Sequence, residues 1–449
     1  MTQPCPPYTP IVGAIVLVVC TGLALPNLGG ATEQLRLDAE TAAALAVDSS
    51  PLARAADAHV AAMESQVASA DAERMPLISI AAQVAHRSSV PEFAVPFNGP
   101  TQEPTVVFPN IRNTYTLGAQ ATQVLFSGGR ITAHRHASAM EAETAGGERD
   151  VVLASLRLQA RIAFWRAFAA EAGVHAAETE VARADRLVDD AAAFVEAGLA
   201  VQADLLSAEA RSSDTRLRLV DTKAERERSL AELRSLIGQI PGVEIELVGQ
   251  MKAPARPETL SELLDEARSQ RPELDAARLR VETARAREAV ARAGTSPSLQ
   301  LSTGWELARP NQRHLPLSDT WNDSLYIALG ASWTVFDGQR TAAAVATAHA
   351  LTDALRADAL ESTRTVLLEV ETARIQLQSA IEATEVAEVA KRAAAARERA
   401  EQDRYQAGIS PIADLLDAQA ELAIAEKNQI KARAAAWTAA AVLDRAVGR

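Results

Sequence analysis

Four segments of the chain alternate apolar and polar residues with the two-residue period of a β-strand. They form two pairs, residues 78–85 with 115–122 and residues 298–307 with 324–336. The third segment shows the alternation most clearly, because one of its faces carries Leu299, Leu301, Thr303, Trp305 and Leu307. The chain is therefore expected to contain four strands of about ten residues, each apolar on one face and small or polar on the other.

Such strands suit either the wall of an outer-membrane barrel or a half-buried sheet in a soluble protein. Alternation alone does not distinguish the two, but the number of strands does. Four strands cannot close a barrel, and an open sheet edge cannot sit in lipid because its backbone groups would have no hydrogen-bond partners. If the strands cross a membrane, several chains must share one barrel, and three chains would supply twelve strands.

Two stretches are expected to form very long helices. Residues 131–196 contain no proline and little glycine, and residues 341–406 contain neither. Each stretch has about 66 residues, which corresponds to about 100 Å of helix at 1.5 Å per residue. Apolar residues recur three and four positions apart in the second stretch, at Val366, Val370, Ala373, Leu377, Ala380 and Ile381. This spacing is typical of helices that pack side by side, so the helices are expected to form a wall shared by several chains.

The chain also contains an internal duplication. Residues 126–130 (FSGGR) recur as 336–340 (FDGQR), and 195–199 (VEAGL) recur as 405–409 (YQAGI), in both cases about 210 residues later. The helix starts at Pro51 and Pro272 lie about 221 residues apart, so the first copy has about eleven extra residues. These are expected to be loop, because the stretch between Pro76 and Phe126 contains five prolines. Each copy thus consists of a helix, two strands and a long helical hairpin.

The joints between strand and long helix have suitable chemistry. Ser127 and Asp337 are residue types preferred at helix N-caps. Gly128, Gly129 and Gly338 allow the tight turn beside them.

The hairpin tips are marked by glycines. Gly198 and Gly408 are expected to end the first helix of each hairpin. In the second copy the helix is expected to restart with Ser410 as its N-cap and Pro411 as its first helical residue.

Composition limits the function. The formal net charge is −13, which argues against nucleic acid as a partner, because phosphates require a basic surface. Aromatic residues make up only 4% of the chain, which favours long helices over a thick globular core. No catalytic motif is recognisable, and His134 and His136 diverge on a helix, so neither an enzyme nor a metal or cofactor site is expected.

The only long apolar run is residues 11–25, which is short for a transmembrane helix and suits a signal peptide over residues 1–31. Cleavage after Ala24 or Ala31 would satisfy the small-residue rule. Residues 1–10 lack Lys and Arg, which leaves an anchoring helix as the alternative. Cys5 and Cys20 both lie in this segment, and lipidation of Cys20 is a further alternative that Val19 disfavours. The remaining organisation is a first repeat at 32–240, a linker at 241–260 and a second repeat at 261–449.

The duplicated order of these motifs resembles the TolC family of outer-membrane efflux proteins. The resemblance rests on the FSGGR and FDGQR joints, the tips AGL…ADLLSAEA and YQAGISPIADLLDAQAEL, and the helix starts SSPLARAADAHVAA and RPELDAARLRVETARA. It covers the chain from about Leu35 to the C-terminus.

The resemblance implies an α+β membrane protein: a homotrimer with a shared twelve-stranded transmembrane β-barrel, four strands per chain, and a long α-helical periplasmic barrel. Residues 241–260 would lie in its equatorial region. The implied function is a passive exit duct in the outer membrane, in contact with its lipid. The duct would serve a tripartite efflux or type I secretion system and bind a periplasmic adaptor and an inner-membrane pump of RND or ABC type. A periplasmic adaptor with one helical hairpin is the alternative reading.

The resemblance also assigns residues. Asp414 and Asp417 match the aspartates that constrict the periplasmic entrance, and a threefold assembly would collect six carboxylates there. The first copy keeps Asp204 but has Ser207 where the second has Asp417. Tyr405 matches a position that holds the closed state, although the basic partner expected near Ser410 is missing.

The tips match the surface where family members meet the adaptor, and they comprise Ala197, Gly198, Leu199, Ala407, Gly408 and Ile409. Simpler explanations exist for both sets: acids in the first turns of a helix complement its dipole, and glycines cap helix ends.

Overall fold

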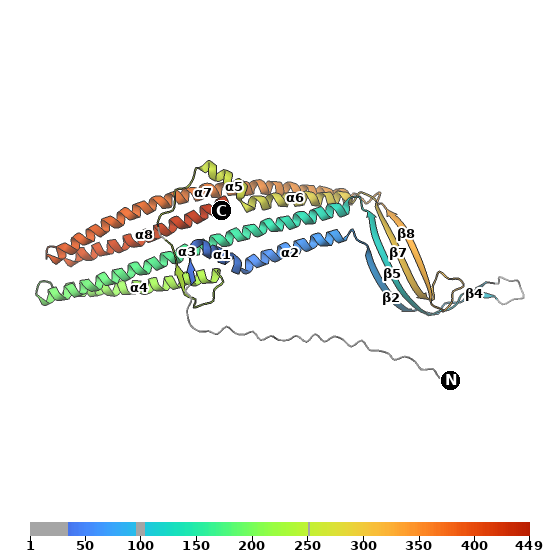
Figure 1. The fold of residues 1–449 in the computed structure, drawn as a ribbon, viewed down its shortest axis with the longest axis horizontal. Coiled ribbons are helices and arrows are strands. Elements are labelled where there is room, and N and C mark those ends of the chain that lie inside the picture. The colour runs from blue at the N-terminus through green and yellow to red at the C-terminus, as the bar shows by residue number, and fades with distance from the viewer. Residues whose placement is uncertain (1–34, 96–103, 250–251) are drawn as a thin grey trace, which may run out of the picture.

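The computed structural model describes residues 35–95, 104–249 and 252–449. The described part is elongated, with long helices at one end, a sheet at the other and a small hairpin projecting beyond the sheet (Figure 1). The first repeat contains β1 (Leu35–Leu37), α1 (Ala39–Ser49), α2 (Pro51–Ala72), β2 (Leu77–His86), β3 (Phe93–Val95), β4 (Thr105–Phe108), β5 (Asn113–Phe126), α3 (Arg130–Glu196) and α4 (Gln202–Leu236). The rest contains β6 (Ile245–Leu247), α5 (Leu260–Gln270), α6 (Pro272–Ala293), β7 (Ser298–Arg309), β8 (Asn322–Ser332), α7 (Arg340–Gln406) and α8 (Ile412–Val447).

The duplication is visible element by element. The helices α2 and α6 both have 22 residues, and α3 and α7 both have 67. Each long helix starts at the sheet and ends at a tip about 100 Å away, from which α4 or α8 returns part of the way (Figure 1). The signal peptide expected over residues 1–31 lies outside the described residues.

The main sheet has the order β2-β5-β7-β8, and all neighbouring strands are antiparallel. Its register places the apolar faces of the four strands on one side. Ile80, Ala119, Trp305 and Leu325 form one cross-strand row, and Ser79, Gln120, Gly304 and Tyr326 form a row on the opposite face. Among the described residues, β2 and β8 each lack a second neighbouring strand, so both edges of the sheet are open.

Two expectations about the strands were wrong. The extra segment of the first copy is not only loop, because β3 and β4 pair there as an antiparallel hairpin whose strands begin at Phe93 and Thr105. The fourth strand ends at Ser332 and does not continue to Phe336. The parallel pair of β1 and β6 was not predicted, because each strand has only three residues.

The helices form a curved layer. Beside the tips the order of neighbours is α4-α3-α8-α7, and beside the sheet it is α2-α3-α6-α7. The layer therefore has the same two open sides as the sheet: α2 and α4 follow the side of β2, and α7 follows the side of β8. No helix in the described ranges has an apolar stretch long enough to cross a bilayer.

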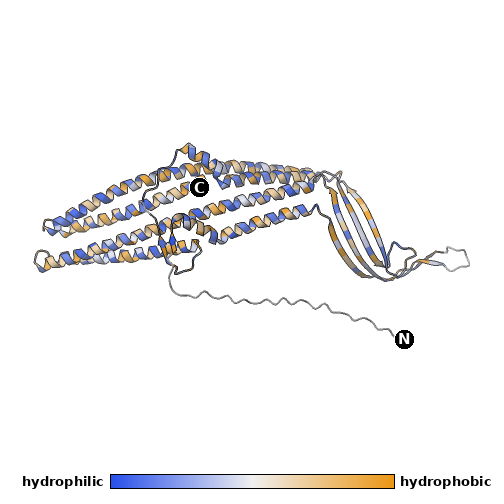
Figure 2. Ribbon diagram, in the orientation of Figure 1, coloured by the Kyte–Doolittle hydropathy of each residue, from blue (hydrophilic) through white to orange (hydrophobic). Residues whose placement is uncertain are grey.

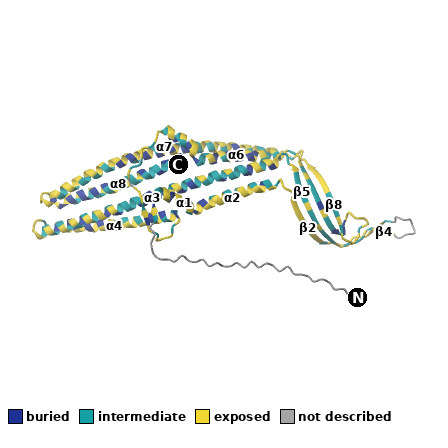
Figure 3. Ribbon diagram, viewed as in Figure 1, coloured by how far each residue is buried: buried dark blue, intermediate teal, exposed yellow. Residues whose placement is uncertain are grey.

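The core is concentrated at mid-length, where α1, α5 and the β1–β6 pair lie against the long helices; buried residues gather there in Figure 3, whereas the sheet is largely exposed. Phe164 and Leu233 are fully buried in the larger cluster, and burial of each contributes about 1.5–3 kcal/mol. The rings of Trp165 in α3 and Trp437 in α8 stack there at 4.6 Å. The Trp437 indole Nε1 donates a hydrogen bond to the Lys252 carbonyl at 2.7 Å, which fixes the 241–260 segment against both hairpins.

Candidate functional site

The sheet exposes an apolar face of membrane dimensions. Ile80 is 76% exposed and Ile327 is 73% exposed, although both lie in the middle of strands. Orange and blue positions alternate along these strands in Figure 2, as expected for lipid on one side and water on the other. The twelve residues of β7 extend about 40 Å, and at a tilt of about 45° they span roughly 28 Å, close to the thickness of a bilayer's hydrocarbon core.

Aromatic side chains border this face at both ends. Trp333 and Phe336 lie near the helix joints, where the Trp333 indole Nε1 donates to the Thr295 carbonyl at 3.2 Å. Tyr115 and Trp321 lie at the opposite end with ring centroids 6.0 Å apart. Aromatic residues in these places are typical of the two membrane–water interfaces.

The joints differ from the predicted N-caps in position. The N-cap residues are Gly129 and Gln339, both in the left-handed conformation, and neither Ser127 nor Asp337 occupies the cap. Although they lie two residues before the N-caps, both side chains still accept hydrogen bonds from backbone amides in the first turn of the helix. The Ile131 amide donates to Ser127 Oγ at 3.3 Å, and the Thr341 amide donates to Asp337 Oδ2 at 2.9 Å.

The glycines at the joints make the turn possible. Gly128, Gly129 and Gly338 all have positive φ. A Cβ at Gly128 would lie 2.0 Å from the Ser296 Cβ, so this joint packs against the turn between α6 and β7 with no room for a side chain.

Both tips use the same backbone motif. Gly198 and Gly408 have φ of 71° and 73°, and each ends its helix as the left-handed residue of a Schellman motif. The amide of Leu199 donates to the Phe194 carbonyl and that of Ile409 to the Arg404 carbonyl, both at 2.8–2.9 Å. Ala197 and Ala407 are the C-cap residues. Leu199 is 77% exposed and Ile409 is 70% exposed, so each tip presents an apolar side chain to solvent.

The restart of the second hairpin also differs from the prediction. Pro411 is the N-cap and α8 begins at Ile412, so Ser410 is not the cap. The Ser410 hydroxyl is buried without a hydrogen-bond partner among the described residues.

Tyr405 joins the two hairpins near their tips. It is only 5% exposed, its ring lies 5.4 Å from that of Phe194, and it packs in a cluster with Leu187 and Leu415. Burial raises the pKa of the Tyr405 hydroxyl, and the nearby charges of Asp204 and Asp190 raise it further. The structure thus brings Tyr405 and Asp204 together, while the Tyr405 hydroxyl has no hydrogen-bond partner among the described residues.

Asp414 and Asp417 lie apart from that cluster. Both are exposed, and their spacing of three residues places them on one face of the first turns of α8. Asp417 is among the acids that raise the pKa of Arg397 in α7, after the dominant hydrogen bond from Arg397 to Glu421. In the first hairpin, the Asp204 carboxylate accepts a hydrogen bond from the Val201 amide at 3.4 Å, which caps α4.

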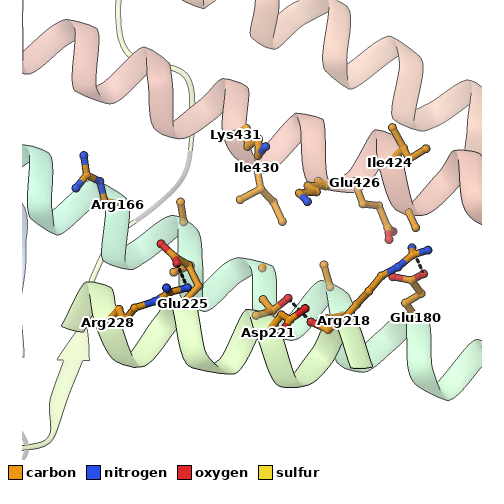
Figure 4. A pocket seen from close by; sticks show the side chains of 18 residues that line it. Arg166, Glu180, Arg218, Asp221, Glu225, Arg228, Ile424, Glu426, Ile430 and Lys431 are labelled. Atoms are coloured by element: carbon orange, nitrogen blue, oxygen red, sulfur yellow. Dashed lines mark hydrogen bonds and ion pairs between the residues drawn. The ribbon is translucent and has the colours of Figure 1, made fainter. Parts of the chain in front are cut away.

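A groove of about 660 Å³ separates the hairpins between α3, α4 and α8 (Figure 4). Its walls are rich in alanine and carry several cations, namely Arg166, Arg218, Arg228, Lys427 and Lys431. Beside it, Arg183 of α3 and Glu426 of α8 form an ion pair at 2.7 Å. Sequence reasoning missed this pair, because 243 residues separate its members and no local motif marks either of them.

The described residues contain no group of three or more His, Cys, Asp or Glu side chains that could hold a metal ion. His134 instead contacts Glu73 through Nδ1 at 2.9 Å.

An open sheet with one lipid-compatible face, continued by helices about 100 Å long, defines a membrane-anchored export channel with a periplasmic tunnel. Comparison with known proteins identifies the family. A model of the outer membrane efflux protein family matches residues 43–239 and 263–449, and the chain belongs to this family. It is also 28% identical to Protein CyaE of Bordetella pertussis over 348 residues, which cover 74% of this chain and 71% of that protein.

Solved channels share the fold. The chain is similar to CusC with a TM-score of 0.75 and 17% identity, covering 93% of this chain and 94% of that one. It is similar to VceC of Vibrio cholerae with a TM-score of 0.73 and 19% identity, covering 91% and 96%. MtrE of Neisseria gonorrhoeae gives a TM-score of 0.73 and 19% identity, covering 91% and 88%.

These findings confirm the predicted family, the fold class, the outer-membrane location with a periplasmic helical tunnel, and the function as an efflux duct. The alternative of a periplasmic adaptor is not supported. Family and neighbours are transport channels and not enzymes. The domain boundaries and the roles of individual site residues remain predictions.

Proposed function

We propose that three copies of this chain close into one continuous duct. The observation that carries this proposal is that the described part of the protomer is open along the same two sides from the sheet to the tips, at β2, α2 and α4 on one side and at β8 and α7 on the other. Joining each β2 side to the β8 side of a neighbour removes every sheet edge from lipid. Three copies give twelve strands and, beside the tips, twelve helices.

In this duct the apolar row of Ile80 and Leu325 faces lipid and the row of Ser79 and Tyr326 faces the water-filled pore. The periplasmic end is narrowed by Asp414 and Asp417. Six exposed carboxylates around one axis repel one another and attract cations, so they favour a cation-selective entrance.

The hairpin tips are the surface for a periplasmic adaptor, which links the duct to an inner-membrane pump of RND or ABC type. Two Schellman turns of the same geometry, one presenting Leu199 and the other Ile409, would offer the adaptor six apolar contacts around the trimer, three of each kind. The pump supplies the energy and the duct is passive. Adaptor binding would separate the hairpins and widen the aspartate constriction.

Opening has a physical basis in the space between the hairpins. At mid-length they are fixed by the Trp165–Trp437 stack and near the tips by the cluster around Tyr405, whereas the groove separates them between these two contacts. Opening would have to break the Arg183–Glu426 pair and the apolar cluster of Leu187, Tyr405 and Leu415 near the tips. The part of the hairpins between the tryptophans and the tips would therefore move apart while the mid-length core stays intact.

Two neighbouring residues of β8 test the assembly. Ile327 lies on the apolar face and Ala328 on the polar face. An arginine at the middle of the lipid-facing surface costs about 2–4 kcal/mol, whereas one in a wet pore costs little. Ile327→Arg should abolish the heat-modifiable trimer in outer-membrane fractions, and Ala328→Arg should retain it. A stable, water-soluble single chain without detergent would refute the proposal.

A further inference from the structure

The pairing of the strands repeats together with the duplication. The offset of 210 residues between the two copies relates β5 to β8, and the offset of 221 residues relates β2 to β7. In the first repeat Ile80 lies opposite Ala119, and in the second repeat the corresponding residues, Leu301 and Leu329, lie opposite each other. The same offsets convert every pair of the β2–β5 ladder into a pair of the β7–β8 ladder, so the two strand hairpins share one register.

The pair of β5 with β7 shows how one repeat joins the other. It is an antiparallel ladder in which Ala119 lies opposite Trp305. The strands that correspond to β5 and β7 are β8 and β2, and these are the two edge strands of the main sheet in the described part of the chain (Figure 1). Because neighbouring strands alternate in direction, β8 runs opposite to β2, as a ladder between the copies would require.

The strand β8 ends where its one neighbour ends. In the sequence the alternation of apolar with small or polar residues continues to residue 336. In the structure β8 stops at Ser332, which lies opposite Ser298, the first residue of β7. Within the described ranges, the segment 333–336 therefore has the sequence of a strand without a ladder.

The strand β5 shows what a second neighbour changes. The residue of β5 that corresponds to Ser332 is Thr122, which lies opposite Leu77, the first residue of β2. The strand nevertheless continues to Phe126, because β7 pairs with it on its other side. The segment 333–336 thus lacks only the neighbour that the corresponding part of β5 has.

We propose that β8 of one copy pairs with β2 of the next copy in the register of the β5–β7 pair. This inference rests on the proposed closure of three copies into one duct. The counterpart of the pair of Ala119 with Trp305 places Leu329 opposite Val84 of the next copy. In the assembly, residues 333–336 then continue β8 alongside residues 78–80 of the next copy.

This register keeps both faces of the sheet continuous across the junction. Leu329 and Val84 lie on the apolar face, and their side chains are 63% and 74% exposed in the single chain. A slip of one residue would turn the faces of one copy over relative to the next, whereas a slip of two residues would keep them aligned. The repeated ladder selects among the registers that differ by two residues, so the experiment compares positions two residues apart.

Engineered cysteines measure the register. Leu329→Cys/Val84→Cys, oxidised with copper phenanthroline in outer-membrane fractions, should give disulfide-linked dimers and trimers on a non-reducing gel. The reason is that Cα atoms of opposite residues lie about 4.5–5.5 Å apart, within the reach of a disulfide. Leu329→Cys/Ala82→Cys and Leu329→Cys/His86→Cys are the matched controls on the same face. Their second cysteine is displaced by about 7 Å along the strand, so they should cross-link at least tenfold more slowly.

The assembly and its register have separate readouts. The wild type should show no disulfide-linked species, because Cys5 and Cys20 both lie in the segment expected to be removed. Faster cross-linking through Ala82 or His86 than through Val84 would overturn the register and leave the assembly standing. So would the lack of any cross-link in variants that still form the heat-modifiable trimer. Absence of that trimer from the wild type would refute the duct, and the register with it.

Discussion

The guanidinium of Arg183 in α3 lies 2.7 Å from the carboxylate of Glu426 in α8, and these side chains are only 16% and 18% exposed. This ion pair joins the two hairpins about 20 Å from their tips. The basic residue expected near Ser410 as part of a latch is absent from the sequence. The structure instead places an ion pair between the hairpins farther from the tips, towards the mid-length core. Because water reaches the pair poorly, the attraction between its charges is stronger than in a surface salt bridge.

We expect Arg183→Gln to favour the open duct. The substitution leaves the Glu426 carboxylate shielded from water without a partner, which costs about 1–3 kcal/mol in the closed arrangement. Single-channel conductance in planar bilayers should rise, and the exchanged pair Arg183→Glu/Glu426→Arg should bring it back towards the wild-type value. Arg166→Gln is the control, because its partner Glu232 belongs to the same hairpin and both side chains are more than half exposed. Equal conductance of Arg183→Gln and wild type would contradict a role in closure.

Asp414→Asn/Asp417→Asn should weaken cation selectivity and relieve block by divalent cations. The reason is that three copies would lose six carboxylates at the narrowest point of the proposed entrance. Reversal potentials in asymmetric salt and titration with a divalent cation measure both effects. Asp358→Asn serves as the control, since Asp358 is exposed on α7 far from the tip. A double variant with wild-type selectivity and block would remove the gate assignment.

The stability of the mid-length core should respond to the charge of Asp444. Burial raises the pKa of this carboxyl, and Glu40 and Glu258 add to the effect, while Arg161 and Arg449 oppose it. Because its pKa is higher in the folded than in the unfolded protein, the ionised form of Asp444 destabilises the fold. This destabilisation is absent below the unfolded pKa of about 3.9, where both states are protonated, and it grows as pH rises through the folded pKa. Asp444→Asn should therefore raise Tm at pH 7 by a few degrees and have no effect near pH 3.

Glu266→Gln should change Tm in the opposite direction. Its hydrogen bonds from Arg449 lower the pKa of the Glu266 carboxyl, so its stabilising contribution is present at neutral pH and is lost as pH falls through that lowered pKa. Tryptophan fluorescence reports both melting curves, because Trp165 and Trp437 lie in this core. A fall in Tm for Asp444→Asn at pH 7 would show that Asp444 is stabilising in its ionised form.

Regular, repeated features were predictable from the sequence. The two long helices begin one residue before the predicted starts, at Arg130 and Arg340, and end at the predicted residues. They were predictable because stretches of this length without proline can form an uninterrupted helix. The strands were predictable because one face meets lipid along their whole length, which enforces alternation.

The missed features depend on contacts between distant segments. The strands β1 and β6 have three residues each, too few to show a period. Ser410 and Pro411 have the residue types of a helix start, yet the Schellman turn at Gly408 uses Ser410 and shifts the start to Ile412. The ion pair of Arg183 with Glu426 exists only because α3 and α8 become neighbours in the fold.

The two open sides of the protomer have a consequence for its biogenesis. Until it meets its copies, a newly exported chain carries two strands, β2 and β8, that lack an outer neighbour among the described residues, together with an exposed apolar face, and both features favour pairing with other chains. Because one side binds the other side of the next copy, a small error in rotation would not close the ring but would extend it into a filament. Overproduction should thus yield insoluble polymer before it yields free monomer.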